Sequence, residues 1–197
     1  MPAVEVWIEY ASTYSYLTVA RIGALADARG VELEWQPFWL GPVRERQGLG
    51  MPFPEGSARA AYMWRDLERR AQRLGIPWRR PEQYPVNSLP WARVALVGAR
   101  EGWCRAFTQE AFRLHWVEGR LIGTEGNMRS ALATAGQDVD RVLAIASSPE
   151  GKEALKQQTE KALSRGIFGA PSFVVGGELF WGDDRLEEAL EWALNPR

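Results

Sequence analysis

The chain has 197 residues, 46% of them hydrophobic and 25% charged, and its 24 basic and 25 acidic residues give a net charge of −1. This is the composition of an ordinary soluble globular protein, long enough for one domain with a full core or for a compact domain with a large insertion. A charge so close to zero argues against nucleic acid or an anionic membrane as a partner. No apolar stretch approaches the length of a membrane span.

The single cysteine, Cys104, excludes an intramolecular disulfide and any metal site built from several cysteines. Residues 1–3 lead directly into a predicted strand, without the charged and apolar segments of a secretory signal, so we expect a cytoplasmic protein. The only histidine, His115, lies between two large apolar residues, which favours a structural or surface role over catalysis. We predict no metal site.

The first predicted elements are a strand, a helix and a second strand. Residues 4–10 alternate between apolar and polar and are rich in β-branched and aromatic side chains, as strands are. Apolar residues then recur at helical spacing over residues 17–28, and residues 31–38 alternate again. Ser12 stands at the start of the helix, where its hydroxyl can accept a hydrogen bond from a free N–H group. The segment predicts a βαβ unit with parallel strands.

The middle of the chain is predicted to be almost entirely helical. Residues 43–57 are rich in glycine and proline and predict a long loop. Helices are expected over residues 59–74, 91–102, 105–118, 127–135, 139–147 and 149–165, the last capped by Ser148.

The sheet pattern returns near the end of the chain. Residues 172–175 and 178–181 predict two strands joined by a Gly176-Gly177 hairpin, followed by a helix over residues 186–194. Asp184, with Glu187 three positions later, fits a capping box for that helix. The order predicts an α/β protein with a thioredoxin-like fold, formed by residues 1–42 and 167–197 and split by an all-helical insertion of residues 43–166.

Four stretches carry a further pattern, residues 12–17, 37–41, 62–77 and 166–185. The most specific runs from Gly166-Ile167-Phe168-Gly169-Ala170-Pro171 to Gly182-Asp183-Asp184-Arg185. In this order the stretches resemble the 2-hydroxychromene-2-carboxylate isomerases and the kappa-class glutathione transferases, which share the thioredoxin-like architecture. The resemblance spans nearly the whole chain.

The resemblance implies a site for a thiol at the turn of residues 12–15. Related disulfide oxidoreductases carry Cys-x-x-Cys there, whereas this chain has Ser12-Thr13-Tyr14-Ser15, which excludes protein-based dithiol chemistry. By resemblance, the Ser12 hydroxyl hydrogen-bonds the sulfur of bound glutathione. A helix N-terminus suits a thiolate because its free N–H groups and dipole stabilise negative charge. Thr13 departs from the proline usual in the family.

The resemblance also implies residues that hold the rest of glutathione. Pro171 is expected to follow a cis peptide bond, which leaves the backbone of Ala170 to pair with the cysteinyl part. Asp183 and Asp184 are expected at the γ-glutamyl end, although the capping box alone would explain Asp184. Arg59 is expected at the glycyl carboxylate and is equally compatible with an ordinary exposed helix residue.

For the acceptor, the resemblance implies Asn87, equally compatible with a helix cap, and Trp39, with Trp64 and Trp181 as further possible walls. The resemblance therefore predicts an isomerase that uses glutathione to add a thiol to the double bond of a small aromatic pyruvate, allow rotation and eliminate. The alternatives are a kappa-like transferase or peroxidase and a non-catalytic thiol-binding protein of the same fold. A homodimer is a family-based expectation.

Overall fold

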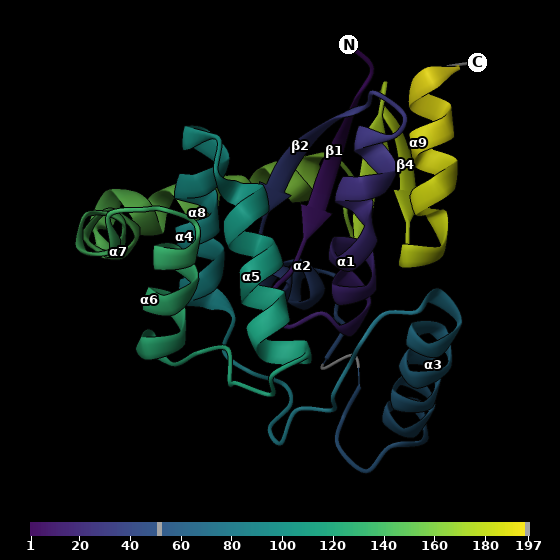
Figure 1. The fold of residues 1–197 in the computed structure, drawn as a ribbon, viewed down its shortest axis with the longest axis horizontal. Helices are drawn as coiled ribbons and strands as arrows, with labels where there is room; N and C mark the ends of the chain where they lie inside the picture. Colours follow the sequence, from purple (N-terminus) through teal and green to yellow (C-terminus); the bar gives the residue numbers. More distant parts are fainter. Residues whose placement is uncertain (51–52, 196–197) are drawn as a thin grey trace.

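A computed structural model describes residues 1–50 and 53–195. Its four-stranded sheet has the order β2-β1-β3-β4. The strands are β1 (Ala3–Ile8), β2 (Glu32–Pro37), β3 (Ser172–Val175) and β4 (Glu178–Trp181). β1 is parallel to β2 and antiparallel to β3, while β3 and β4 form an antiparallel hairpin. With α1 (Thr13–Asp27) between β1 and β2, this is the predicted thioredoxin-like fold (Figure 1).

The two faces of the sheet are buried in separate apolar clusters, because successive strand residues point to opposite sides. Val6 and Phe173 lie in the larger cluster with residues of α1 and of α9 (Leu186–Leu194). Trp7 and Val174 lie in the smaller one, with residues of two helices on the opposite face. Both faces are therefore covered.

The segment between β2 and β3 is helical, as predicted. Figure 1 shows α4 to α7 to one side of the sheet and α3 below it. Ser148 caps α8 by accepting a hydrogen bond from Gly151 N–H at 3.0 Å. The helices of this segment are α2 (Leu40–Arg46), α3 (Ala58–Leu74), α4 (Leu89–Glu101), α5 (Cys104–Trp116), α6 (Glu125–Thr134), α7 (Val139–Ser147) and α8 (Pro149–Ser164).

The predicted loop of residues 43–57 is wrong over its first part, because α2 continues to Arg46. Pro42 is accommodated in the first turn, where backbone N–H groups lack intrahelical acceptors. Val43 is fully buried with Phe38 in the smaller cluster, and this burial stabilises the short helix. Residues 51–52 of the predicted loop lie outside the described residues.

The predicted capping box of the last helix is also wrong. Residues Asp183–Arg185 form a 3-10 turn, η1, and α9 begins after Arg185 without a side-chain cap. Asp184 is exposed and lies 3.8 Å from the guanidinium of Arg185, while Glu187 pairs with Arg21 of α1. Asp184 and Glu187 therefore pair with arginine side chains and not with the backbone N–H groups that a capping box would use.

Every helix within residues 1–50 and 53–195 is too short or too polar to cross a membrane.

Candidate functional site

Ser12 connects two segments of the thioredoxin-like fold that lie far apart in the sequence. It caps α1, its hydroxyl oxygen accepting a hydrogen bond from Ser15 N–H at 3.1 Å. The same hydroxyl donates to the backbone oxygen of Ala170 at 3.1 Å. The Ala170-Pro171 peptide bond is cis, as the resemblance implied. The turn before α1 and the loop before β3 therefore meet at the Ser12 side chain.

The N-terminus of α1 has the character of an anion site. Ser12 N–H donates to the backbone oxygen of Glu9 at 3.1 Å, and Ser15 N–H is occupied by Ser12. The N–H groups of Thr13 and Tyr14 have no intrahelical acceptor, because they belong to the first turn. They and the dipole of a fifteen-residue helix favour negative charge beside Ser12.

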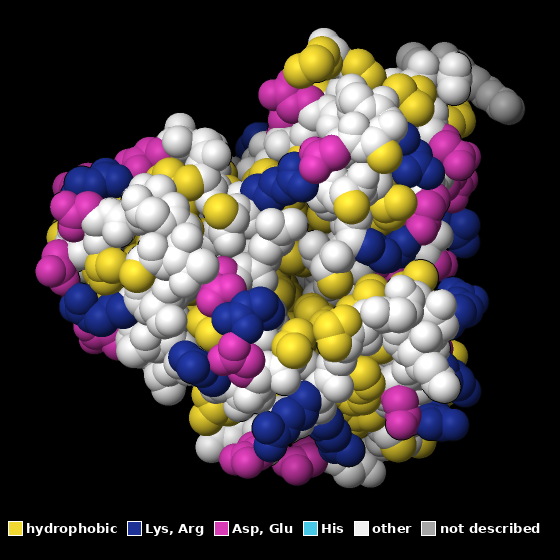
Figure 2. Space-filling view, in the orientation of Figure 1, with side chains coloured by type: hydrophobic (Ala, Val, Ile, Leu, Met, Phe, Trp, Pro, Cys, Tyr) yellow, Lys and Arg dark blue, Asp and Glu magenta, His cyan; other side chains and the backbone are white. Residues whose placement is uncertain are grey.

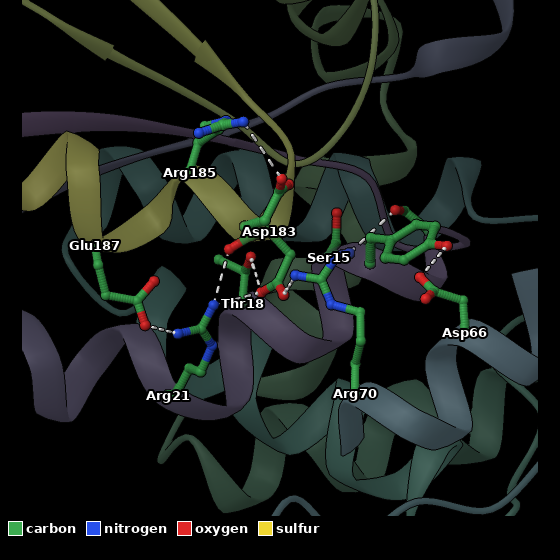
Figure 3. A network of polar contacts seen from close by, with 11 residues as sticks. Ser15, Thr18, Arg21, Asp66, Arg70, Asp183, Arg185 and Glu187 are labelled. Carbon is green, nitrogen blue, oxygen red and sulfur yellow. Dashed lines mark hydrogen bonds and ion pairs between the residues drawn. The ribbon is translucent and has the colours of Figure 1, made fainter. Parts of the chain in front are cut away.

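Asp183 is buried and held by three side chains from two helices (Figure 3). Its carboxylate accepts hydrogen bonds from Thr18 Oγ1 at 3.0 Å, from Arg21 at 3.0 Å and from Arg70 of α3 at 2.6 Å. Its side chain is 0% exposed, and those of Arg21 and Arg70 are 14% and 18% exposed. In this arrangement Asp183 ties α3 to α1, so of the two predicted acidic residues only Asp184 presents its carboxylate to solvent.

Arg59 lies on the face of α3 that approaches α1. Residues 59, 63, 66 and 70 follow one another at spacings of four, three and four along the helix and therefore share that face. On it, Asp66 accepts a hydrogen bond from the Tyr14 hydroxyl at 2.9 Å, and Arg70 reaches Asp183. Arg59 itself is exposed near the first turn of the helix. Burial and the neighbouring charge of Arg59 lower the pKa of the Arg44 guanidinium, so Arg59 lies near α2, and its contact with a glycyl carboxylate stays a prediction.

The residues predicted to contact an acceptor lie at three places. Trp39, 39% exposed, precedes α2, and Trp181, 54% exposed, covers Gly169 and packs edge-on against Phe168. Asn87 accepts a hydrogen bond from Leu89 N–H at 3.2 Å, but the N-cap position of α4 is occupied by Ser88, so the predicted capping role of Asn87 is wrong. Trp181 lies against Gly169, the residue that precedes Ala170.

A cavity of about 630 Å³ opens beside α3. Trp64, Trp78 and Tyr84 form aromatic walls, and the Arg80 guanidinium lies 4.6 Å from the Trp64 ring centroid. Figure 2 shows apolar side chains gathered between α5 and α3 on this face of the molecule. None of the residues predicted from the sequence to bind glutathione lines the cavity.

A family model for DsbA-like thioredoxin domains matches residues 3–193. The chain belongs to the DsbA-like thioredoxin family.

The chain is similar to enzymes of two named kinds. A 2-hydroxychromene-2-carboxylate isomerase from Sphingobium xenophagum is 26% identical over 98% of this chain and 98% of its own. A glutathione S-transferase kappa 2 from Caenorhabditis elegans is 26% identical over 98% of this chain and 92% of its own. A solved structure of a 2-hydroxychromene-2-carboxylate isomerase has a TM-score of 0.88, 28% identity, and coverage of 98% of this chain and 94% of its own.

Sequence reasoning missed Glu9, a buried residue whose side chain forms a hydrogen bond within the turn before Ser12. Its carboxylate accepts hydrogen bonds from Ala11 N–H at 2.8 Å and from the Ser88 hydroxyl. Glu9 is 6% exposed and Ser88 5% exposed. The alternating pattern of residues 4–10 gave no signal for this burial, because the pattern assigns polar residues to a solvent face.

Burial raises the pKa of the Glu9 carboxyl to about 7, although the hydrogen bonds from Ser88 and Ala11 oppose the rise. Since the folded-state pKa lies above that of the unfolded chain, the carboxyl stabilises the fold most at acidic pH. That stabilisation is lost as the pH rises through about 7.

The stability of Glu9→Gln relative to the natural protein should therefore increase by about 2 kcal/mol between about pH 5 and pH 8. Urea unfolding of both proteins at each pH measures this difference. A difference that is constant with pH would show that Glu9 ionises in the folded protein as readily as in the unfolded chain.

Ser15, in the first turn of α1, has a buried hydroxyl without a hydrogen-bond partner among the described residues. An unpaired buried hydroxyl is destabilising, and alanine is the better helix former. Ser15→Ala should therefore raise the free energy of unfolding by about 1 kcal/mol. The control is Ser147→Ala, which removes an exposed hydroxyl that already donates to Leu143 O at 2.7 Å. A loss of stability in Ser15→Ala would mean that this hydroxyl is paired in solution.

Neither His115 nor Cys104 belongs to the Ser12 site. His115 is fully buried, and burial lowers the pKa of its imidazole. Cys104 is buried against Thr108, and burial raises the pKa of its thiol to about 12. Such a thiol is almost entirely protonated near neutral pH and is a poor nucleophile. The structural role predicted for His115 is confirmed.

Proposed function

We propose that this protein is a glutathione-dependent isomerase of the 2-hydroxychromene-2-carboxylate type. The observation that carries the proposal is the contact between Ser12, at the N-terminus of α1, and the backbone of Ala170 before the cis-proline. The proposal is supported because a hydroxyl donor and the N–H groups of the first helical turn lie beside the loop that would pair with the peptide. Similarity to proteins named as such isomerases supports the reaction type.

The residues present suit a bound thiol. The N–H groups of Thr13 and Tyr14 and the helix dipole would stabilise a thiolate beside Ser12. The Ser12 hydroxyl, which now donates to Ala170 O, would turn to the sulfur and keep its bond from Ser15 N–H. Glutathione would supply a thiolate that adds to the double bond of an aromatic pyruvate and later leaves, so that the bond can rotate in between.

The rest of the tripeptide would extend across groups from three segments. The Ala170 backbone pairs with the cysteinyl part, next to Pro171. Asp184, with its exposed carboxylate, is the better partner for the γ-glutamyl amine, because Asp183 is occupied by Arg21 and Arg70. Arg59 would meet the glycyl carboxylate from α3.

The aromatic acceptor would lie against the exposed indole rings that flank this site. Trp181 lies over Gly169, one residue before Ala170, and Phe168 packs against it with ring centroids 4.8 Å apart. Trp39 and Asn87 are proposed as further contacts. Flat apolar rings suit these exposed aromatic surfaces, which gain from stacking and burial.

Steady-state assays test the proposal directly. We expect isomerisation of chromene carboxylate only in the presence of glutathione, with little conjugation of a halogenated aromatic acceptor. The opposite preference would support the kappa-like transferase instead, which the Caenorhabditis elegans relative makes the second candidate. Absence of glutathione binding in calorimetry would overturn both and favour a different ligand on the same fold.

Arg59→Ala should weaken glutathione binding about tenfold, because a charge-assisted hydrogen bond to the glycyl carboxylate is lost. Calorimetric titration with glutathione measures the change. The control is Arg73→Ala, which removes an exposed arginine from the last turn of the same helix. Equal affinities of the two variants would exclude Arg59 from the site.

A further inference from the structure

Glu9 controls the backbone of the turn that presents Ser12. Its side chain accepts Ala11 N–H at 2.8 Å and its backbone oxygen accepts Ser12 N–H at 3.1 Å. Two consecutive N–H groups of the turn are therefore fixed by one residue. The same carboxylate also accepts a hydrogen bond from Ser88, which precedes α4. Glu9 thus joins the Ser12 turn to the helical segment.

Among the residues that the structure describes, the Glu9 carboxylate has no basic partner. No ion pair among the described residues includes Glu9. The ionisable groups that face it are the hydroxyls of Tyr10 and Tyr84, and burial raises the pKa of both. Tyr10 follows Glu9 directly after β1, and Tyr84 lies in the segment before α4 that also contains Ser88. A negative charge on Glu9 is therefore held by hydrogen bonds alone.

We propose that Glu9 is a positioning residue of the thiol site, which holds the Ser12 turn and, by its own charge, sets the pH at which a thiolate is stable there. The inference rests on the proposed function, since it concerns the thiol that Ser12 would bind. Because Ala11 precedes Ser12 directly, a sulfur beside the Ser12 hydroxyl lies within about 10 Å of the Glu9 carboxylate. Two negative charges at that separation in a protein repel one another.

The consequence is a coupled titration. The Glu9 carboxyl, whose pKa is raised to about 7, and a bound thiol would lose their protons over the same pH range. Ionised Glu9 would raise the pKa of the thiol by about one unit, and the thiolate would in turn keep Glu9 protonated. In the thiolate state Glu9 is then neutral and still hydrogen-bonded within the turn.

The test compares glutathione bound to the natural protein, Glu9→Gln and Glu5→Gln from about pH 5 to pH 9. Glutamine keeps the size and an acceptor oxygen of Glu9 but cannot ionise. Ultraviolet absorbance of the thiolate gives its pKa, and calorimetry gives the dissociation constant. We expect the thiol pKa to fall by about one unit in Glu9→Gln, with the dissociation constant at about pH 6 changed less than threefold.

Glu5→Gln is the matched control, because Glu5 lies in β1, which directly precedes Glu9, but pairs with Arg165 at 2.9 Å. It should leave the thiol pKa unchanged. An equal thiol pKa in Glu9→Gln and the natural protein would overturn the inference while leaving the proposed function intact. Failure of the natural protein to bind glutathione would overturn the proposed function and the inference with it.

Ser88→Ala tests the inference independently of the folding of Glu9→Gln. Loss of the Ser88 hydroxyl removes a hydrogen bond that favours ionised Glu9, so Glu9 should stay neutral to higher pH. The thiol pKa should then fall, as in Glu9→Gln but by less. A rise of the thiol pKa in Ser88→Ala would contradict the proposed coupling.

Discussion

Replacing Ser12 by alanine should lower glutathione-dependent turnover about 100- to 1,000-fold, the usual effect of removing one donor to an anion that forms during a reaction. The variant loses the hydroxyl that would turn from Ala170 O to the bound sulfur. The pKa of the bound thiol should rise in parallel, because fewer donors stabilise the thiolate. Turnover and the thiolate absorbance of the complex measure the two effects.

The same substitution also removes a helix cap, which costs about 1 kcal/mol of stability. Ser148→Ala is the control, since Ser148 caps α8 through an equivalent bond to Gly151 N–H at 3.0 Å. We expect both variants to lose similar stability and only Ser12→Ala to lose turnover. Unchanged turnover in Ser12→Ala would contradict the role of Ser12 as a donor to the thiolate.

Replacing Asp183 by asparagine should lower the free energy of unfolding by about 4 kcal/mol, because it leaves the side chain of Arg70 buried without a counter-charge. Asparagine has nearly the shape of aspartate, so the loss reports the charge. Arg21 keeps Glu187 as a partner, whereas no other carboxylate of the described residues pairs with Arg70. Urea unfolding at neutral pH measures the difference.

Glu188→Gln is the control for an exposed ion pair. Glu188 pairs with Arg185 at 3.2 Å, with side chains 55% and 53% exposed. Exposed pairs contribute little, so this variant should lie within about 0.5 kcal/mol of the natural protein. Equal stability of Asp183→Asn and Glu188→Gln would show that the buried carboxylate is not needed to compensate its two arginines.

The strands, and most helices, followed from local patterns. Strand alternation in residues 4–10, the Gly176-Gly177 hairpin and the Ser148 cap each depend on neighbours within a few residues, and the structure contains all three elements. The helix α2 was missed because Gly41 and Pro42 in its first turn, and the glycines and prolines that follow it, favour a loop locally. What stabilises it is the burial of Val43 against distant residues, which no local pattern contains.

The parts of the candidate site that depend on a short local motif could be predicted. The parts that depend on charged or polar residues from distant elements could not. Ser12 and the cis bond before Pro171 are both features of a turn or loop with its own residue pattern. Asp183 looked available because its partners, Arg21 and Arg70, are 162 and 113 residues away. Glu9 looked like a solvent-facing strand residue because Ser88, its partner, comes 79 residues later.

The pairing of β1 with β3 also bears on how the chain is made. β1 lies in the middle of the sheet, yet its second neighbour belongs to the last quarter of the chain. While residues from α2 to α8 are synthesised, at about 5–20 residues per second, one edge of an apolar strand has no partner. Unpaired strand edges promote aggregation. We therefore expect the risk of aggregation to be greatest in that interval on the ribosome, before β3 pairs with β1.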